Sequence, residues 1–135
     1  PDATDEECIA AATTIYADRF IRKFADGYQH KMEEGGAGLS AGEKQLISFA
    51  RIILKDPAVI ILDEATSSID TETETLIKEA LDVIIKDKTA FIVAHRLSTI
   101  RNADRILYIA NKGIAEQGTH AELMEKKGLY YALNV

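Results

Sequence analysis

Two adjacent carboxylates at the end of a short apolar run are the side chains with the clearest chemical use. Residues 59–62 (Val-Ile-Ile-Leu) lead directly into Asp63 and Glu64. An apolar run of this length, after the helix-stopping Asp56-Pro57, predicts a strand that is buried on both faces. Ligands of open α/β sheets bind where the strands end, so an Asp there can hold a divalent cation. The neighbouring Glu can accept a proton from water. On this pattern alone, a strand that ends in solvated acids is the more frequent outcome.

A single histidine follows a second apolar run. Residues 89–93 (Thr-Ala-Phe-Ile-Val) predict another buried strand, and His95 comes just after it. The other two histidines, His30 and His120, lie in different contexts and not at metal-ligand spacing. A lone histidine at a strand end is more often a polar boundary residue than a functional group. Its function must therefore be judged from the segments around it.

Several segments surround these groups in a fixed order. Residues 39–45 (Leu-Ser-Ala-Gly-Glu-Lys-Gln) precede the acids, residues 65–70 (Ala-Thr-Ser-Ser-Ile-Asp) follow them, and residues 92–100 contain the histidine. Together they resemble the signature motif, the D-loop and the switch-histidine loop of the ATP-binding-cassette (ABC) ATPases. Residues 59–64 then resemble the Walker B motif, and residues 118–123 are typical of the exporter branch. The resemblance covers nearly the whole chain, and the motifs are specific because they occur in register.

The resemblance implies a division of labour between the two acids and the histidine. Asp63 is expected to contact Mg²⁺ through water, since Mg²⁺ sheds its hydration shell slowly. Glu64 is expected to orient and deprotonate the attacking water. His95 is expected to hydrogen bond the γ-phosphate of ATP and to hold the catalytic Glu64. Such a site works mainly by positioning and charge stabilisation.

The signature-like segment is also a helix start. Ser40-x-x-Glu43 matches a capping box, which predicts an ordinary capped helix. The same match occurs at three other expected helix starts, Thr4-x-x-Glu7, Thr71-x-x-Glu74 and Thr119-x-x-Glu122. The helix end at Ser40 presents free N–H groups that suit an anion. The resemblance implies that Ser40, Ala41, Gly42 and Glu43 bind the ATP held by the opposite subunit, with Gly42 allowing a close backbone approach. Ala41 and Glu43 stand where Gly and Gln are usual, and the Glu43 carboxylate would repel a polyphosphate.

Three further residues are expected at contacts with partner domains. Ser68 and Asp70 match the D-loop, which crosses the interface between two nucleotide-binding domains in a head-to-tail dimer. Asp70 is equally placed to cap a helix. Glu34 occupies the position of the exporter X-loop glutamate, which touches the transmembrane domain. Glu33 replaces the usual Gly there, and a solvated acidic loop is the structural alternative.

A phosphate-binding loop of the form G-x-x-x-x-G-K-[ST] is absent from these 135 residues. The glycine-rich residues 35–44 contain no Gly-Lys-Ser/Thr, and no predicted strand precedes them. We therefore interpret the chain as the C-terminal portion of an exporter-type nucleotide-binding domain without its Walker A half. We expect the piece alone to be inactive.

Composition excludes some classes of function. The net charge of −6, with Lys and Arg scattered, argues against a nucleic-acid surface. The single Cys8 cannot form an internal disulfide, which fits a reducing compartment. No apolar run approaches the roughly 20 residues that span a bilayer. With the resemblance, this implies a location at the cytoplasmic face of a membrane, as part of a transporter.

The fold is predicted from alternating strands and helices, which indicate an α/β class with parallel pairing. Helices are expected at 5–24 (with a break near 17–18), 41–55, 72–86, 119–126 and 128–133, and strands at 58–62, 89–93, 105–109 and 114–117. The last two strands form a predicted hairpin. The resemblance implies a P-loop-NTPase-like parallel sheet with an N-terminal helical subdomain. We expect residues 1–55 to form the helical (signature) subdomain and 56–135 the C-terminal part of the α/β ATPase core.

Two functional hypotheses follow. The first is the ATP-binding and ATP-hydrolysing portion of an ABC exporter, with ATP and Mg²⁺ bound in the full domain dimer and hydrolysis coupled to transmembrane transport. The second is a non-catalytic, degenerate dimerisation or regulatory remnant of such an ATPase. The intact Asp63, Glu64 and His95 favour the first, and the missing phosphate loop favours the second. Chromosome-maintenance ATPases share two of the motifs but need coiled-coil heptads, which residues 1–38 do not show.

Overall fold

The computed structural model describes residues 2–63, 69–94 and 97–135. Contacts between backbone segments divide the chain into two compact units, residues 1–91 and 92–135. Each unit has its own apolar cluster. None of the helices in the described residues is both long and apolar enough to cross a bilayer.

Helices dominate the first unit. Helix α1 (Asp5–Thr14) is followed by a short α2 (Asp18–Ile21). Tyr16, with a φ of 64°, lies in the break that the sequence predicts near residues 17–18. The 3₁₀ turns η1 (Gly27–Gln29) and η2 (Glu34–Gly36) lie in the glycine-rich loop. Helix α3 (Ala41–Lys55) has the expected bounds, and α4 (Thr71–Ile85) begins and ends one residue before its expected position.

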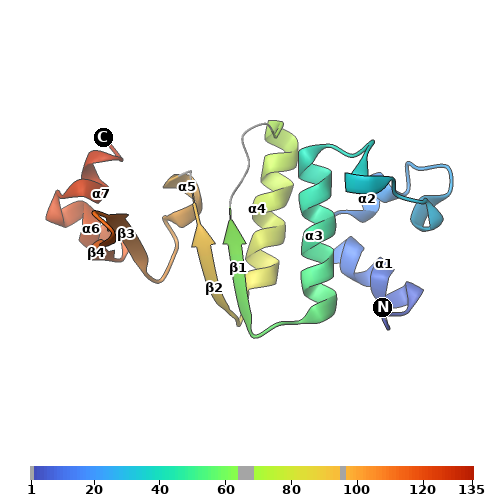
Figure 1. Cartoon of the computed structure of the whole chain (residues 1–135), viewed down its shortest axis with the longest axis horizontal. Coiled ribbons are helices and arrows are strands. Elements are labelled where there is room, and N and C mark those ends of the chain that lie inside the picture. Colours follow the sequence, from blue (N-terminus) through green and yellow to red (C-terminus); the bar gives the residue numbers. More distant parts are fainter. Residues whose placement is uncertain (1, 64–68, 95–96) are drawn as a thin grey trace. The chain divides into compact units, whose positions relative to one another are not determined.

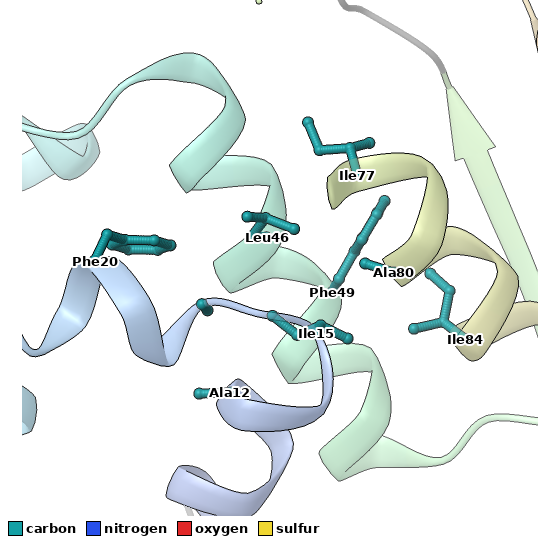
Figure 2. Packing of buried hydrophobic residues seen from close by; sticks show 9 residues of the cluster. Ala12, Ile15, Phe20, Leu46, Phe49, Ile77, Ala80 and Ile84 are labelled. Atoms are coloured by element: carbon teal, nitrogen blue, oxygen red, sulfur yellow. The ribbon is translucent and has the colours of Figure 1, made fainter. Parts of the chain in front are cut away.

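The core of this unit lies between α3 and its neighbours. Figure 2 shows Leu46 and Phe49 of α3 between Ile15 on one side and Ile77 and Ala80 of α4 on the other. Phe49 and Leu46 are almost completely buried, and their three-residue spacing puts them on one apolar stripe of the helix. Burial of this stripe holds α3 in place.

Strands β1 (Val59–Asp63) and β2 (Thr89–Val93) form a two-stranded sheet. Both run in the same direction, with α4 between them in sequence (Figure 1). This arrangement confirms the α/β class with a parallel sheet.

Burial of these strands differs from the expectation. On β1, Ile60 is buried and Leu62 packs against the helical core. The alternate residues are more than half exposed: Val59 (53%), Ile61 (75%), Phe91 (55%) and Val93 (54%). The prediction that both strands are buried on two faces is therefore wrong for this chain. Among the described residues of the first unit, the helices pack on one face of the sheet only.

The second unit is a hairpin with three short helices. Strand β3 (Ile106–Ala110) pairs antiparallel with β4 (Gly113–Gly118), with an irregular register after Tyr108. Asn111 and Lys112 join the two strands, both with positive φ, as a tight hairpin turn of the primed type requires. This confirms the predicted hairpin.

The helices of this unit complete its small core. Helices α6 (His120–Lys126) and α7 (Leu129–Ala132) confirm the expected C-terminal pair. Helix α5 (Leu97–Ile100) was not expected. Leu123 and Tyr130 are buried with Ile106 of β3, so one face of the hairpin is covered by α6 and α7.

Helix starts follow the local chemistry of the sequence in three of four cases. Thr4, Ser40 and Thr119 each accept a hydrogen bond in a complete capping box, as predicted. The fourth box, expected at Thr71, is wrong because Asp70 is the N-cap of α4. The domain boundary expected between residues 55 and 56 stays a prediction.

Candidate functional site

The candidate site lies at one end of the first unit. The carboxyl ends of β1 and β2 and the first turns of α3 and α4 point to the same end of this unit, the upper one in Figure 1. Strand ends and helix N-termini meet at the binding edge of an open α/β sheet. The local fold therefore places Asp63, at the end of β1, and the N-caps Ser40 and Asp70 toward this edge.

Asp63 is the last residue of β1 and is exposed. No group of three or more His, Cys, Asp or Glu side chains that would hold a metal ion occurs in the part of the chain that is described. A Mg²⁺ ion that keeps most of its waters needs only one or two protein carboxylates, so a single exposed Asp fits such an ion. Glu64, Ser68 and His95, the other groups expected here, lie outside the described residues.

Ser40 caps α3. Its Oγ accepts from the backbone N–H of Glu43 at 3.2 Å, and the Glu43 Oε2 accepts from the Ser40 N–H at 2.8 Å. The Glu43 carboxylate thus turns back onto the cap. Its negative charge lies beside the positive end of the helix dipole, which is favourable without any ligand.

Gly42 is buried where α3 meets α4. A methyl group added to it would overlap the Cγ2 methyl of Thr73 and would lie 3.4 Å from Cγ2 of Ile69. The missing side chain therefore lets the starts of the two helices pack closely. The close approach of Gly42 to a phosphate stays a prediction.

Asp70 caps α4. Its Oδ1 accepts from the Thr73 backbone N–H at 2.9 Å. This bond, followed by one from the Thr73 side chain, lowers the pKa of Asp70 below its ordinary value. The helix cap, one of the two roles expected for Asp70, is confirmed, and the interface role stays a prediction.

The loop that carries Glu34 is fixed at its start. Asp18 accepts from Arg22 Nε at 2.7 Å and from the Tyr28 hydroxyl at 2.6 Å. Partial burial and the bond to Asp18 raise the pKa of Tyr28 to about 12. Glu34 itself is exposed at the beginning of η2. The loop start is pinned at Tyr28, and Glu34 faces solvent.

Thr73 was not among the predicted site residues, although it lies in the first turn of α4 beside the N-cap Asp70. The spacing Asp70-x-x-Thr73 is itself an N-cap signal, because an N-cap carboxylate accepts from the backbone three residues later. Either cap, Asp70 or Thr71, places Thr73 in the first turn. Its contact with Gly42 has no signal in the sequence.

Residues 4–67 match the ABC transporter family. Over 133 residues, the chain is 53% identical to the uncharacterized ABC transporter ATP-binding protein YknV of Bacillus subtilis, covering 98% of this chain and 22% of that protein. It is 49% identical to the fatty acid ABC transporter ATP-binding/permease protein of Mycobacterium bovis, covering 98% of this chain and 21% of the relative. A Staphylococcus aureus protein, named provisionally as a multidrug export ATP-binding/permease protein, is 53% identical over 96% of this chain and 22% of its own length.

The chain thus spans about a fifth of the length of the curated relatives that it matches. The identity extends through both units and is not limited to the Walker B region. The fold, the motif order and these relatives agree: the chain belongs to the ABC transporter family, within its nucleotide-binding domain.

Proposed function

We propose that this chain forms part of the ATP-hydrolysing site of an ABC exporter, coupling hydrolysis to transport across a membrane. The observation that carries the proposal is the convergence of Asp63, at the end of β1, with the capped starts of α3 and α4 at one edge. Names of relatives that join ATP-binding and permease functions support it.

The residues divide the work as follows. Asp63 holds Mg²⁺ through water, and Glu64 accepts a proton from the attacking water. His95 hydrogen bonds the γ-phosphate. Since phosphoryl transfer asks little covalent chemistry of the protein, these groups act by position and charge.

A second nucleotide-binding domain completes the site. The start of α3, with Ser40 to Glu43, faces the ATP held by the opposite domain, and Ser68 and Asp70 lie at the interface. Glu34 contacts the transmembrane domain, so the domain works at the cytoplasmic face of the membrane. The 135 residues contain no phosphate-binding loop, so we expect this chain alone to bind ATP no more tightly than about 1 mM.

Glu64→Gln tests the proposal in a nucleotide-binding domain that includes these residues. The amide keeps the shape and loses the base, so we expect hydrolysis to fall by about 100-fold or more while ATP binding persists. Steady-state ATPase rates and size-exclusion profiles with ATP measure both properties, and a closed dimer should accumulate. Turnover near the wild-type rate would refute the role of Glu64. A wild-type domain that dimerises without hydrolysing ATP would favour a non-catalytic remnant.

A further inference from the structure

The start of α4 carries one side chain that connects the two capped helix ends. Thr73 is half-buried in the first turn of α4. Its Cγ2 methyl occupies the space beside Gly42 that a side chain on α3 would need. Its backbone N–H donates to Asp70 Oδ1 at 2.9 Å, and its side chain, after this backbone bond, helps to lower the pKa of Asp70. Thr73 therefore contacts the start of α3 through its methyl group and the N-cap of α4 through its backbone N–H.

We propose that Thr73 is a positioning residue that fixes the start of α3 and Asp70 relative to each other. The methyl branch holds the Ser40-to-Gly42 turn, and the hydroxyl branch holds the Asp70 carboxylate. This inference rests on the proposed function, in which both groups face a nucleotide shared with a second domain. No contact between Thr73 and the nucleotide is required.

The closeness of the packing makes this role specific. Ile69 packs at the same place, because its Cγ2 also faces Gly42 and its side chain packs against the core. Ser40 and Asp70 themselves are exposed, so packing around their own side chains restrains them little. A threonine methyl packed between the two helices provides that restraint through van der Waals contact.

Two conservative variants separate the branches. Thr73→Ser keeps the hydroxyl and removes the methyl, whereas Thr73→Val keeps the methyl position and removes the hydroxyl. Thr75→Ser is the matched control, because Thr75 lies on the exposed face of the same helix. Among the contacts described, its hydroxyl donates only to the carbonyl of Thr71 in the same helix, at 3.1 Å.

Kinetics in a nucleotide-binding domain that includes this chain test the methyl branch. Loss of one buried methyl changes an equilibrium constant by a factor of roughly four. A smaller fraction of domains then has α3 correctly placed, which raises the apparent KM for Mg-ATP by up to that factor. We expect Thr73→Ser to raise KM with kcat nearly unchanged, and Thr75→Ser to change neither. Equal KM values for Thr73→Ser and wild type would overturn the proposal.

Carboxyl-detected NMR of the 135-residue chain tests the hydroxyl branch. Thr73→Val should move the Asp70 pKa back toward its ordinary value, and Thr73→Ser should leave it lowered, because only the valine variant loses the side-chain bond. An Asp70 titration unchanged in Thr73→Val would overturn this branch. Glu64→Gln, measured beside these variants, keeps the two ideas separate. If that variant is inactive and Thr73→Ser keeps the wild-type KM, the positioning role fails and the proposed function stands.

Discussion

Gly42→Ala should destabilise the first unit although alanine favours helices. The added methyl would overlap the Thr73 methyl, and it would lie 3.3 Å from Thr73 Cβ and 3.4 Å from Ile69 Cγ2. Overpacking of this kind costs about 1–3 kcal/mol, and we expect the upper half of that range because both helices are packed along their length. Replacing Gly in a helix recovers about 1 kcal/mol. The net loss should be about 1–2 kcal/mol in the free energy of unfolding.

The clash has one named partner, so it should be relieved by a second substitution. Thr73→Ser alone removes a half-buried methyl and should cost about 0.5–1 kcal/mol. In the double variant, the methyl group that Gly42→Ala introduces takes the vacated space. The double variant should then be about as stable as wild type, so the two effects should not add, and the interaction energy should be about 1.5–3 kcal/mol in the favourable direction.

Urea unfolding of the 135-residue chain, followed by circular dichroism, measures all four species of this cycle. Gly113→Ala is the control, because a methyl added there meets nothing within 4 Å. A Gly42→Ala variant as stable as wild type, or two substitutions that simply add, would show that α3 and α4 do not meet as closely as the structure has them.

Two further predictions concern other contacts. Glu116 accepts from the Tyr130 and Leu129 N–H groups at 2.9 and 2.8 Å, and these bonds lower the pKa of its carboxyl group. The stability that the carboxylate adds is therefore complete above the ordinary carboxyl pKa. It is lost as the pH falls through the lowered pKa. Glu116→Gln should lower the melting temperature at pH 7, and its melting temperature should approach that of wild type in acid. Glu125→Gln, on the exposed face of α6, is the control and should show no such convergence. A difference in melting temperature between Glu116→Gln and wild type that stays constant with pH would contradict this. Phe49→Ala should lower the free energy of unfolding, measured in urea, by about 3–5 kcal/mol, because Phe49 fills the space between α1 and α4. A loss below about 1 kcal/mol would show that this core is not packed so closely.

The helices were predictable because their signals are local. Ser40-x-x-Glu43 and the apolar stripe that follows defined α3 to the residue. Two overlapping signals compete at the start of α4, Asp70-x-x-Thr73 and Thr71-x-x-Glu74, and the aspartate is the cap. An Asp carboxylate is the better acceptor for an N-terminal amide, and its charge complements the helix dipole.

Burial of the strands was not predictable because it depends on what covers each face. An apolar run specifies that a strand can be buried on both sides, and not which element lies there. On β1, Ile60 and Leu62 meet the helical side, and Ile61 is 75% exposed. The contact of Gly42 with Thr73 belongs to the same category, since it joins positions that are distant in sequence.

Several of the predicted nucleotide contacts also have a structural role in this chain. Ser40 and Glu43 complete a capping box, Gly42 admits Thr73, and Asp70 caps α4. Each of these residue types would be favoured at its position even if no nucleotide were bound. The two helix starts are therefore held in place by the chain's own contacts before a nucleotide binds. A base next to Asp63 is required by the chemistry of hydrolysis itself, so substitution of Glu64 is the more decisive experiment.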